Sequence, residues 1–437
     1  MKKVYKYFVL LGLVVFSPWY IYRMLPLNMD GIWNYGFAYN ISKGLIPYLD
    51  YNMIVPPLWP YLVSIPVYFI GNHLITYYVI ISILIAGITY ICYKKIGYKA
   101  LFIYLLLLIY PHNGYNIFCL FLFMILLCYI DKENDILIAI IVSLMILTKQ
   151  TMGILIIPSI IYSKKKKKTI CVYLVFCLLL LLYLVINNNF FEFVNYCFLG
   201  MLDFTNNSND SFLLFFIVEI IVVGYLFVAF LKSKKRSLLY IMLFQVIVVP
   251  IFEPSHFFWG FVPVIYYVLG NYKKLVRYFF GLMIGTFVIT FYIQIIYSFY
   301  DDRGSIYLND KSFINGKRLP KFTNYEFDLV HNYIDEYKDY RLYILASNAY
   351  LYKLEYGIPI NKYDLINDGN MGYNGSKVYV EEIDNYCKKN KCLFMIDSSE
   401  TVQDFNQVNR EITGYIINNY LFIYSSSDVT FFVNMFH

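Results

Sequence analysis

A succession of apolar runs along residues 7–299 constrains this chain more than any other feature, because most are long enough to cross or nearly cross a bilayer. Only 15% of the residues are charged and 59% are apolar, a balance that would leave a soluble fold covered with apolar surface. We therefore predict a polytopic α-helical membrane protein with about eleven transmembrane helices. The runs lie near 7–25, 73–93, 100–114, 116–130, 135–147, 152–163, 169–187, 212–231, 237–252, 257–270 and 278–299.

Basic clusters between these runs test the order of the crossings. If the N-terminus is cytoplasmic and the crossings alternate, all the clusters fall on the cytoplasmic side, as membrane insertion favours. A single kinked helix over 135–163 would invert everything downstream, and the clusters argue against it. We expect a multi-pass plasma-membrane protein and, despite the net charge of +7, no nucleic-acid partner. The clusters are Lys94, Lys95 and Lys99, then Lys132, Lys164–Lys168, Lys232–Arg236, and Lys273, Lys274 and Arg277.

From about residue 300 the composition becomes mixed and polar. The pattern predicts helices over 325–337, 378–389 and 408–420, and strands over 341–346, 392–396 and after 420. We expect a small extracytoplasmic α/β domain at 300–437, beside a transmembrane module at 1–299. Cys387 and Cys392 lie in this polar part and could form a disulfide there, whereas the other six cysteines lie in or beside apolar runs and are interpreted as packing residues.

The first predicted outer loop, 26–72, carries a compound pattern. Residues 28–52 read NMDGIWNYGFAYNISKGLIPYLDYN, and a double proline, Pro56-Pro57, follows. An acid just past the first apolar run, an amphipathic stretch, a G-x-x-P-Y-x-D turn and the double proline together resemble the first extracytoplasmic loop of GT-C glycosyltransferases. That superfamily includes protein O-mannosyltransferases, lipid A aminoarabinose transferases and related bacterial enzymes. The resemblance implies a polyprenyl-phosphate-linked sugar donor.

Two acids in this loop are candidate site residues. The resemblance implies that Asp30 is the catalytic general base, and a carboxylate at a membrane surface can accept the proton of an attacking hydroxyl. The alternative is that Asp30 caps a helix beginning near Ile32. Asp50 could bind the acceptor, support a divalent cation or stabilise the turn after Pro47. Gly31 stands where relatives often have a second acid, which weakens a paired-carboxylate metal site; a divalent cation is possible and no cofactor is certain.

Two further predicted outer turns carry polar residues. Lys149 and Gln150 lie in a turn between apolar runs, and similar Lys-Gln turns in GT-C relatives imply binding of the donor phosphate. The alternative for Lys149 is a lysine that extends to the membrane interface. Glu253 and His256 resemble an acid-histidine pair near a late helix of the same relatives, in which the histidine donates to phosphate or sugar and the acid orients it. A structural role for His256 is equally open.

Together these patterns favour an extracytoplasmic-facing glycosyltransferase. The expected reaction is an inverting transfer of a sugar from a polyprenyl phosphate to a hydroxyl of a surface glycan, lipid or protein, with membrane lipid as the surroundings. A polysaccharide polymerase is one alternative, but it typically has a large loop between late helices and a short C-terminus. A transporter or flippase is the other, and it would need paired halves and a polar path through the bundle.

Overall fold

The computed structural model describes the chain from Lys2 to Asn434, apart from several short stretches and one longer one. The stretches outside the described residues are 26, 109–112, 133, 201–209, 250–253, 272–284, 286–303, 307, 310–311, 346–348, 359, 365–369, 374, 398–406 and 426–428. The predicted run 278–299 lies outside the described residues except for Gly285.

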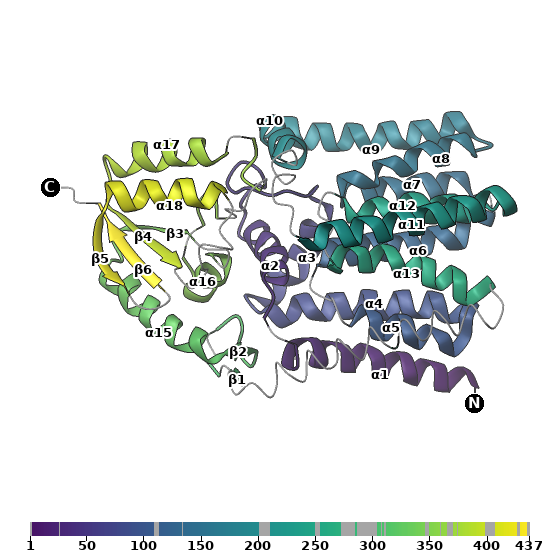
Figure 1. Ribbon diagram of the computed structural model, residues 1–437, viewed down its shortest axis with the longest axis horizontal. Helices are drawn as coiled ribbons and strands as arrows, with labels where there is room; N and C mark the ends of the chain where they lie inside the picture. Colours follow the sequence, from purple (N-terminus) through teal and green to yellow (C-terminus); the bar gives the residue numbers. More distant parts are fainter. Residues whose placement is uncertain are drawn as a thin grey trace.

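A bundle of helices makes up the larger part of the molecule (Figure 1). Every predicted apolar run before residue 278 contains a helix. Among the residues that the structure describes, four segments are long and apolar enough to cross a membrane: Leu74–Leu107, Gly114–Lys132, Lys166–Ile186 and Phe216–Ser233. The number of crossings stays a prediction. The elements are α1 (Lys2–Arg23), α2 (Met29–Ser42), α3 (Leu58–Ile70), α4 (Leu74–Ile96), η1 (Gly97–Lys99), α5 (Ala100–Leu107), α6 (Gly114–Tyr129), η2 (Ile130–Lys132), α7 (Asp135–Ile146), η3 (Gln150–Leu155), α8 (Ile156–Ile161), α9 (Lys166–Ile186), α10 (Phe190–Val194), the π-helical η4 (Asn195–Leu199), α11 (Asp210–Ser233), α12 (Arg236–Phe244), η6 (Gln245–Val248) and α13 (Pro254–Asn271).

The chain reverses direction between α7 and η3. The backbone of Lys149 is extended, with φ −148° and ψ 117°, so it cannot continue the helix that ends at Ile146. Helix α7 packs against both η3 and α8. A single kinked helix over 135–163, the alternative that would have inverted the downstream helices, is therefore wrong.

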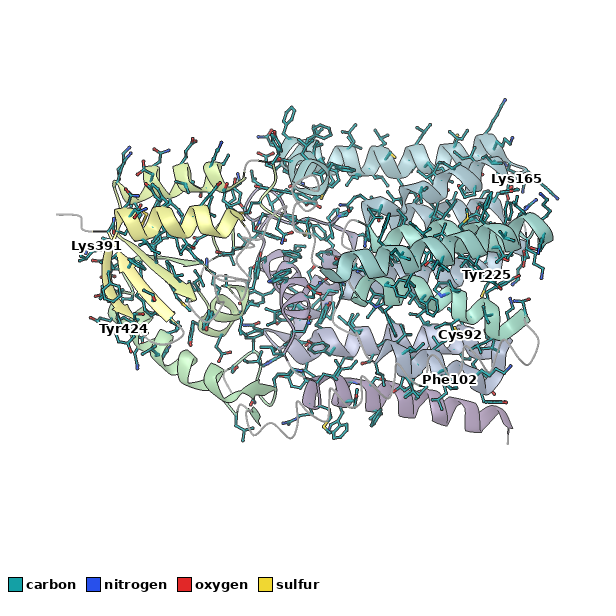
Figure 2. All side chains as sticks on the ribbon, in the orientation of Figure 1. Cys92, Phe102, Lys165, Tyr225, Lys391 and Tyr424 are labelled. Atoms are coloured by element: carbon teal, nitrogen blue, oxygen red, sulfur yellow. A yellow bond between two sulfur atoms is a disulfide. The ribbon has the colours of Figure 1, made fainter. Side chains whose placement is uncertain are left out.

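The basic turns gather at one end of the bundle. The chain between α8 and α9, which carries Lys165, lies at the same end as the N-terminus, while the C-terminal part lies at the opposite end (Figure 1). Figure 2 shows Lys165 and Lys391 at these two ends of the molecule. This arrangement agrees with the predicted alternation of the helices. Which end faces the cytoplasm stays a prediction.

The C-terminal part forms a four-stranded sheet with helices packed around it. Its strand order is β3-β4-β6-β5, with β3 parallel to β4 and the other pairs antiparallel. The predicted helices and strands are present, and Cys387 and Cys392 form a disulfide between the end of α17 and the start of β4. The elements are β1 (Gly304–Ile306), β2 (Arg318–Pro320), α15 (Lys321–Glu336), β3 (Arg341–Leu345), α16 (Ala349–Tyr356), α17 (Gly375–Cys387), β4 (Cys392–Asp397), α18 (Gln407–Asn419), β5 (Leu421–Ser425) and β6 (Val429–Val433).

The C-terminal part is packed closely on α2 and on the loop that follows it. Helix α16 lies against α2, where the ring of Tyr350 occupies the space that a Cβ at Gly36 would need. Further along, the Asn52 backbone N–H donates to Lys362 O at 2.7 Å, and its Nδ2 donates to Asn370 O at 2.9 Å. The C-terminal part therefore helps to fix the first outer loop.

Candidate active site

Asp30 lies in the first turn of α2, one residue after the helix begins. The N-cap is Asn28, whose side-chain oxygen accepts from Gly31 N at 3.3 Å. The alternative that Asp30 caps this helix is therefore wrong, because the cap position is already filled. The half-buried Asp30 carboxylate instead lies at the positive end of the helix, and its charge acts on the phenol groups of Tyr77 and Tyr78 in α4.

Asp50 closes a tight turn in the first outer loop. Its Oδ2 accepts from Ile46 N at 2.7 Å, and its backbone N–H donates to Ile46 O at 3.0 Å. Within this turn Tyr48 has a φ of 71°, a left-handed conformation that side chains rarely adopt, so the turn needs such bracing. The turn-stabilising interpretation of Asp50 is thus observed directly. No group of three His, Cys, Asp or Glu residues suited to a metal occurs in the described part of the chain.

Lys149 is buried between the helices, with only 5% of its surface exposed. Its Nζ donates to Asn116 Oδ1 at 3.1 Å and to Ile247 O at 2.6 Å, and it lies 5.8 Å from the centre of the Tyr115 ring. A lysine that extends to the membrane interface would keep its ammonium group in water. Lys149 does the opposite, so the interfacial interpretation is wrong.

The charge of Lys149 is not balanced by an acid in the described part of the chain, where no carboxylate pairs with it. Burial lowers the pKa of Lys149 to about 7, because a desolvated ammonium group is costly and its neutral acceptors compensate only in part. An anion beside Nζ would reverse this shift. The site is therefore suited to receive a negative charge.

Gln150 holds the loop rather than facing Lys149. Its Nε2 donates to Cys197 O at 2.7 Å and to Ile54 O at 3.2 Å. These bonds tie η4 to the end of the first outer loop. The contacts of Gln150 indicate a positioning role for that loop.

His256 lies in the first turn of α13 and is buried, with its ring edge-on to Trp259 at 5.4 Å between centroids. Burial, with a smaller contribution from the charge of Lys149, lowers the pKa of this ring well below its usual value. Glu253, the predicted partner of His256, lies outside the described residues.

Two hydrogen bonds join candidates and their neighbours at the start of α6. The Tyr77 hydroxyl, on which the charge of Asp30 acts, accepts from Gly114 N at 2.8 Å, and Asn116, two residues later, accepts from Lys149 at 3.1 Å. Asp30, Asn116 and Lys149 each lie at or next to the start of a helix, and α2 lies beside the C-terminal part (Figure 1).

Sequence reasoning missed two members of this set, Asn116 and Tyr77. Asn116 had a detectable signal, because it is a polar residue at the start of the apolar run 116–130. Tyr77 had none, since tyrosine is abundant throughout this chain.

Comparison with solved structures identifies the architecture. ArnT from Cupriavidus metallidurans in the apo state has a TM-score of 0.59 over 100% of this chain and 99% of its own, at 10% sequence identity. The chain has the GT-C fold. ArnT bound to undecaprenyl phosphate gives a TM-score of 0.58, with 98% of this chain and 97% of that one covered at 10% identity. No family model and no curated protein sequence matches the chain.

Within this GT-C fold the arrangement separates two chemical functions. A half-buried carboxylate, Asp30, can accept a proton, while Lys149 and His256 form a region that can accept an anion. Asp50 and Gln150 brace the loop between them.

Proposed function

We propose that this chain is a membrane glycosyltransferase that moves a sugar from a polyprenyl phosphate to a hydroxyl of a surface glycan, lipid or protein. The observation that carries the proposal is the buried ammonium group of Lys149, which meets only neutral acceptors in the described part of the chain. Leaving such a cation uncompensated is costly unless a ligand supplies the opposite charge. The ArnT structure with undecaprenyl phosphate makes a lipid-linked phosphate the natural candidate.

The leaving group is the lipid phosphate. As the bond between the anomeric carbon and the phosphate oxygen breaks, that oxygen gains negative charge. The Lys149 ammonium group stabilises this charge, and it does so strongly because the site is buried. His256 lies beside Lys149 and can donate a further hydrogen bond to the phosphate or to the sugar.

The acceptor hydroxyl attacks the anomeric carbon from the face opposite the phosphate, so the configuration inverts. A new carbon–oxygen bond forms, the bond to phosphate breaks, and the hydroxyl proton passes to the Asp30 carboxylate. General-base assistance of this kind contributes roughly 10²- to 10⁴-fold to the rate. The N-cap of α2 is Asn28, so Asp30 does not serve as the cap of this helix.

The Asp30→Asn variant tests this assignment. It keeps the shape of the side chain but removes the proton acceptor, so transfer should fall roughly 10²- to 10⁴-fold. The readout is the composition of the surface glycans in cells that lack the native chain and express the variant, with membrane levels matched by immunoblot. Asp131→Asn, an exposed acid in η2 near the opposite end of α6, is the matched control and should behave like the wild type. Normal surface composition with Asp30→Asn would refute the base assignment.

Orientation has its own test. We expect Lys338→Cys, in the C-terminal part, to react with a membrane-impermeant maleimide on intact cells, because this part faces outward. Lys165→Cys, in the basic turn, should react only after permeabilisation. Both positions are exposed, and the wild-type cysteines give the background. The reverse labelling pattern would place the candidate site on the cytoplasmic side and exclude an extracytoplasmic reaction.

A further inference from the structure

Asn116 has a hydrogen-bonding group that no part of the described chain satisfies. It is fully buried in the first turn of α6, and its Oδ1 accepts from Lys149 Nζ. Because an ammonium group can only donate, the amide must turn its oxygen toward Lys149. The Nδ2 of the same amide therefore lies beside the ammonium group, and it has no acceptor among the described residues.

Trp59 contributes a second buried donor near the same helix start. Its indole packs so closely on Gly114 that a Cβ there would overlap the ring. Only 1% of Trp59 is exposed, and its Nε1 also lacks an acceptor among the residues that the structure describes. Gly114 is the first residue of α6, two positions before Asn116.

These observations place two buried donors without acceptors near the start of α6, where one buried acceptor, Asn113 Oδ1, also has no partner among the described residues. The Asn116 amide lies beside Lys149, and the Trp59 indole packs on Gly114, so both unpartnered donors lie near the positive end of α6. Burying a donor without a partner costs its desolvation free energy, so such a set is unfavourable when nothing is bound. A phosphate group supplies several acceptor oxygens and a negative charge together, which satisfies the lysine and the neutral donors at once.

We propose that Asn116 binds the lipid-linked sugar substrate. Its Nδ2 donates a hydrogen bond to a phosphate oxygen of that substrate, beside Lys149. This inference rests on the proposed function and names a contact within it. Asn116 adds a hydrogen bond without adding a second desolvated cation. The departing phosphate is thus held by one charged group and at least one neutral group.

A positioning role for Asn116 must be separated from direct contact, because its Oδ1 also orients Lys149. A double-mutant cycle makes the separation. If Asn116 only orients Lys149, then Asn116→Leu has no further effect once Lys149 has been changed to Met. If Asn116 contacts phosphate, the substitution weakens binding in both backgrounds.

The experiment measures binding of undecaprenyl phosphate to the purified full chain in nanodiscs of neutral lipid, through intrinsic tryptophan fluorescence. Asn116→Leu should weaken binding about 10- to 100-fold, as expected for loss of a hydrogen bond to a charged group. Asn116→Asp, which keeps an acceptor for Lys149 but removes the donor, should weaken binding at least as much. If Asn116→Leu does not fold, Asn116→Asp still tests the loss of the Nδ2 hydrogen bond. Melting temperature monitors folding.

Asn40→Leu is the matched control. Asn40 is a buried asparagine of α2 whose Nδ2 likewise lacks an acceptor among the described residues, and it follows Asp30 by almost three turns of helix. Its replacement should leave lipid binding unchanged. Equal weakening by Asn40→Leu would mean that Asn116→Leu reports general damage, and the inference would fall.

The outcomes distinguish this inference from the function on which it rests. Wild-type protein that does not bind undecaprenyl phosphate would overturn the proposed function. If the wild type binds, Lys149→Met weakens binding and neither Asn116 variant changes it, only the Asn116 contact is overturned. The same holds if Asn116→Leu weakens binding when Lys149 is present but not in the Lys149→Met variant. Displacement of the lipid by inorganic phosphate at a similar concentration would refute a site for lipid-linked phosphate.

Discussion

Two buried lysines, Lys149 between the helices and Lys353 in the C-terminal part, differ in what surrounds their ammonium groups. Lys353 Nζ donates to both carboxylate oxygens of Asp364, at 2.7 and 2.6 Å, and both side chains are almost fully buried. Asp364 also accepts from Asn361 N at 2.7 Å. Lys149 meets one amide oxygen and one backbone carbonyl instead.

The difference in hydrogen-bond partners indicates a different role for each lysine. A buried ion pair with its remaining hydrogen bonds satisfied is complete, and it needs nothing from outside the protein. A buried cation without a carboxylate is incomplete, and its energetic cost is recovered when an anion binds. Lys353 therefore belongs to the architecture of the C-terminal part, and the contrast supports the proposed ligand-binding role of Lys149.

A third buried lysine shows that a missing carboxylate is not sufficient by itself. Lys317 donates to Ile21 O and Leu25 O at the end of α1, at 3.1 and 2.8 Å, and lies near the faces of two tyrosine rings. Burial lowers the pKa of Lys317 to about 7, as it does that of Lys149. Lys317, however, meets two carbonyl oxygens at the negative end of α1, whereas Lys149 meets one carbonyl oxygen, Ile247 O, and an amide oxygen at the positive end of α6. The surroundings of Lys317 therefore stabilise a cation more fully than those of Lys149.

The largest expected effect concerns Lys353. Lys353→Met leaves Asp364 buried without its partner and should destabilise the protein by about 3–5 kcal/mol. The melting temperature in detergent should fall by roughly 3–5 °C. The double variant Lys353→Met/Asp364→Leu removes both charges and should regain most of the loss. A single variant as stable as the wild type would show that the ion pair is not required for folding.

Lys149→Met should give the opposite result. Transfer activity should fall roughly 10²- to 10³-fold, the cost of removing a group that stabilises a developing charge. The melting temperature should stay the same or rise, because the variant removes a buried charge that has no acid partner among the described residues. Activity and melting temperature are measured on the same purified sample. A fall in melting temperature as large as that of Lys353→Met would mean that Lys149 has a structural role instead.

The sequence predicted the helices well because burial against lipid or protein requires long apolar runs, which are visible without partners. The same pattern singled out Lys149, because a lysine in a predicted outer turn runs against the usual distribution of charge, and its role in binding stays a prediction. The start of α2 was predicted too late, at Ile32 rather than Met29. The apolar pattern begins at Ile32, but the helix is initiated by a local hydrogen bond from Gly31 N to the side chain of Asn28.

Long-range contacts were beyond the reach of sequence patterns. Asn116 lies 33 residues from Lys149, and Ile247 lies 98 residues away, so no spacing rule links them. Asp50 is the reverse case. Its partner, Ile46, is only four residues away, yet the sequence left acceptor binding, cation support and turn bracing equally open, because the same carboxylate chemistry suits all three.

The pH dependence of lipid binding is the smallest and most specific expected effect. With a pKa of about 7, Lys149 in the unliganded protein is mostly charged below pH 7 and loses its proton above it. Bound phosphate favours the charged lysine and raises its pKa, so binding above pH 7 must take up a proton. Affinity for undecaprenyl phosphate should therefore fall between pH 7 and 9, by up to about tenfold per pH unit. The phosphate itself, whose second ionisation lies near pH 6, hardly titrates over this range.

Lys149→Met supplies the control for this titration. Without the lysine, binding should be weak and nearly constant between pH 7 and 9, so the difference between the two proteins isolates the Lys149 proton. Lys353, already paired with Asp364, should contribute no such slope, and this can be checked with the Lys353→Met/Asp364→Leu variant, which should follow the wild-type curve. Wild-type affinity that stays flat from pH 7 to 9 would mean that the ammonium group keeps its proton without the ligand. The contrast between Lys149 and Lys353 would then rest only on their hydrogen-bond partners.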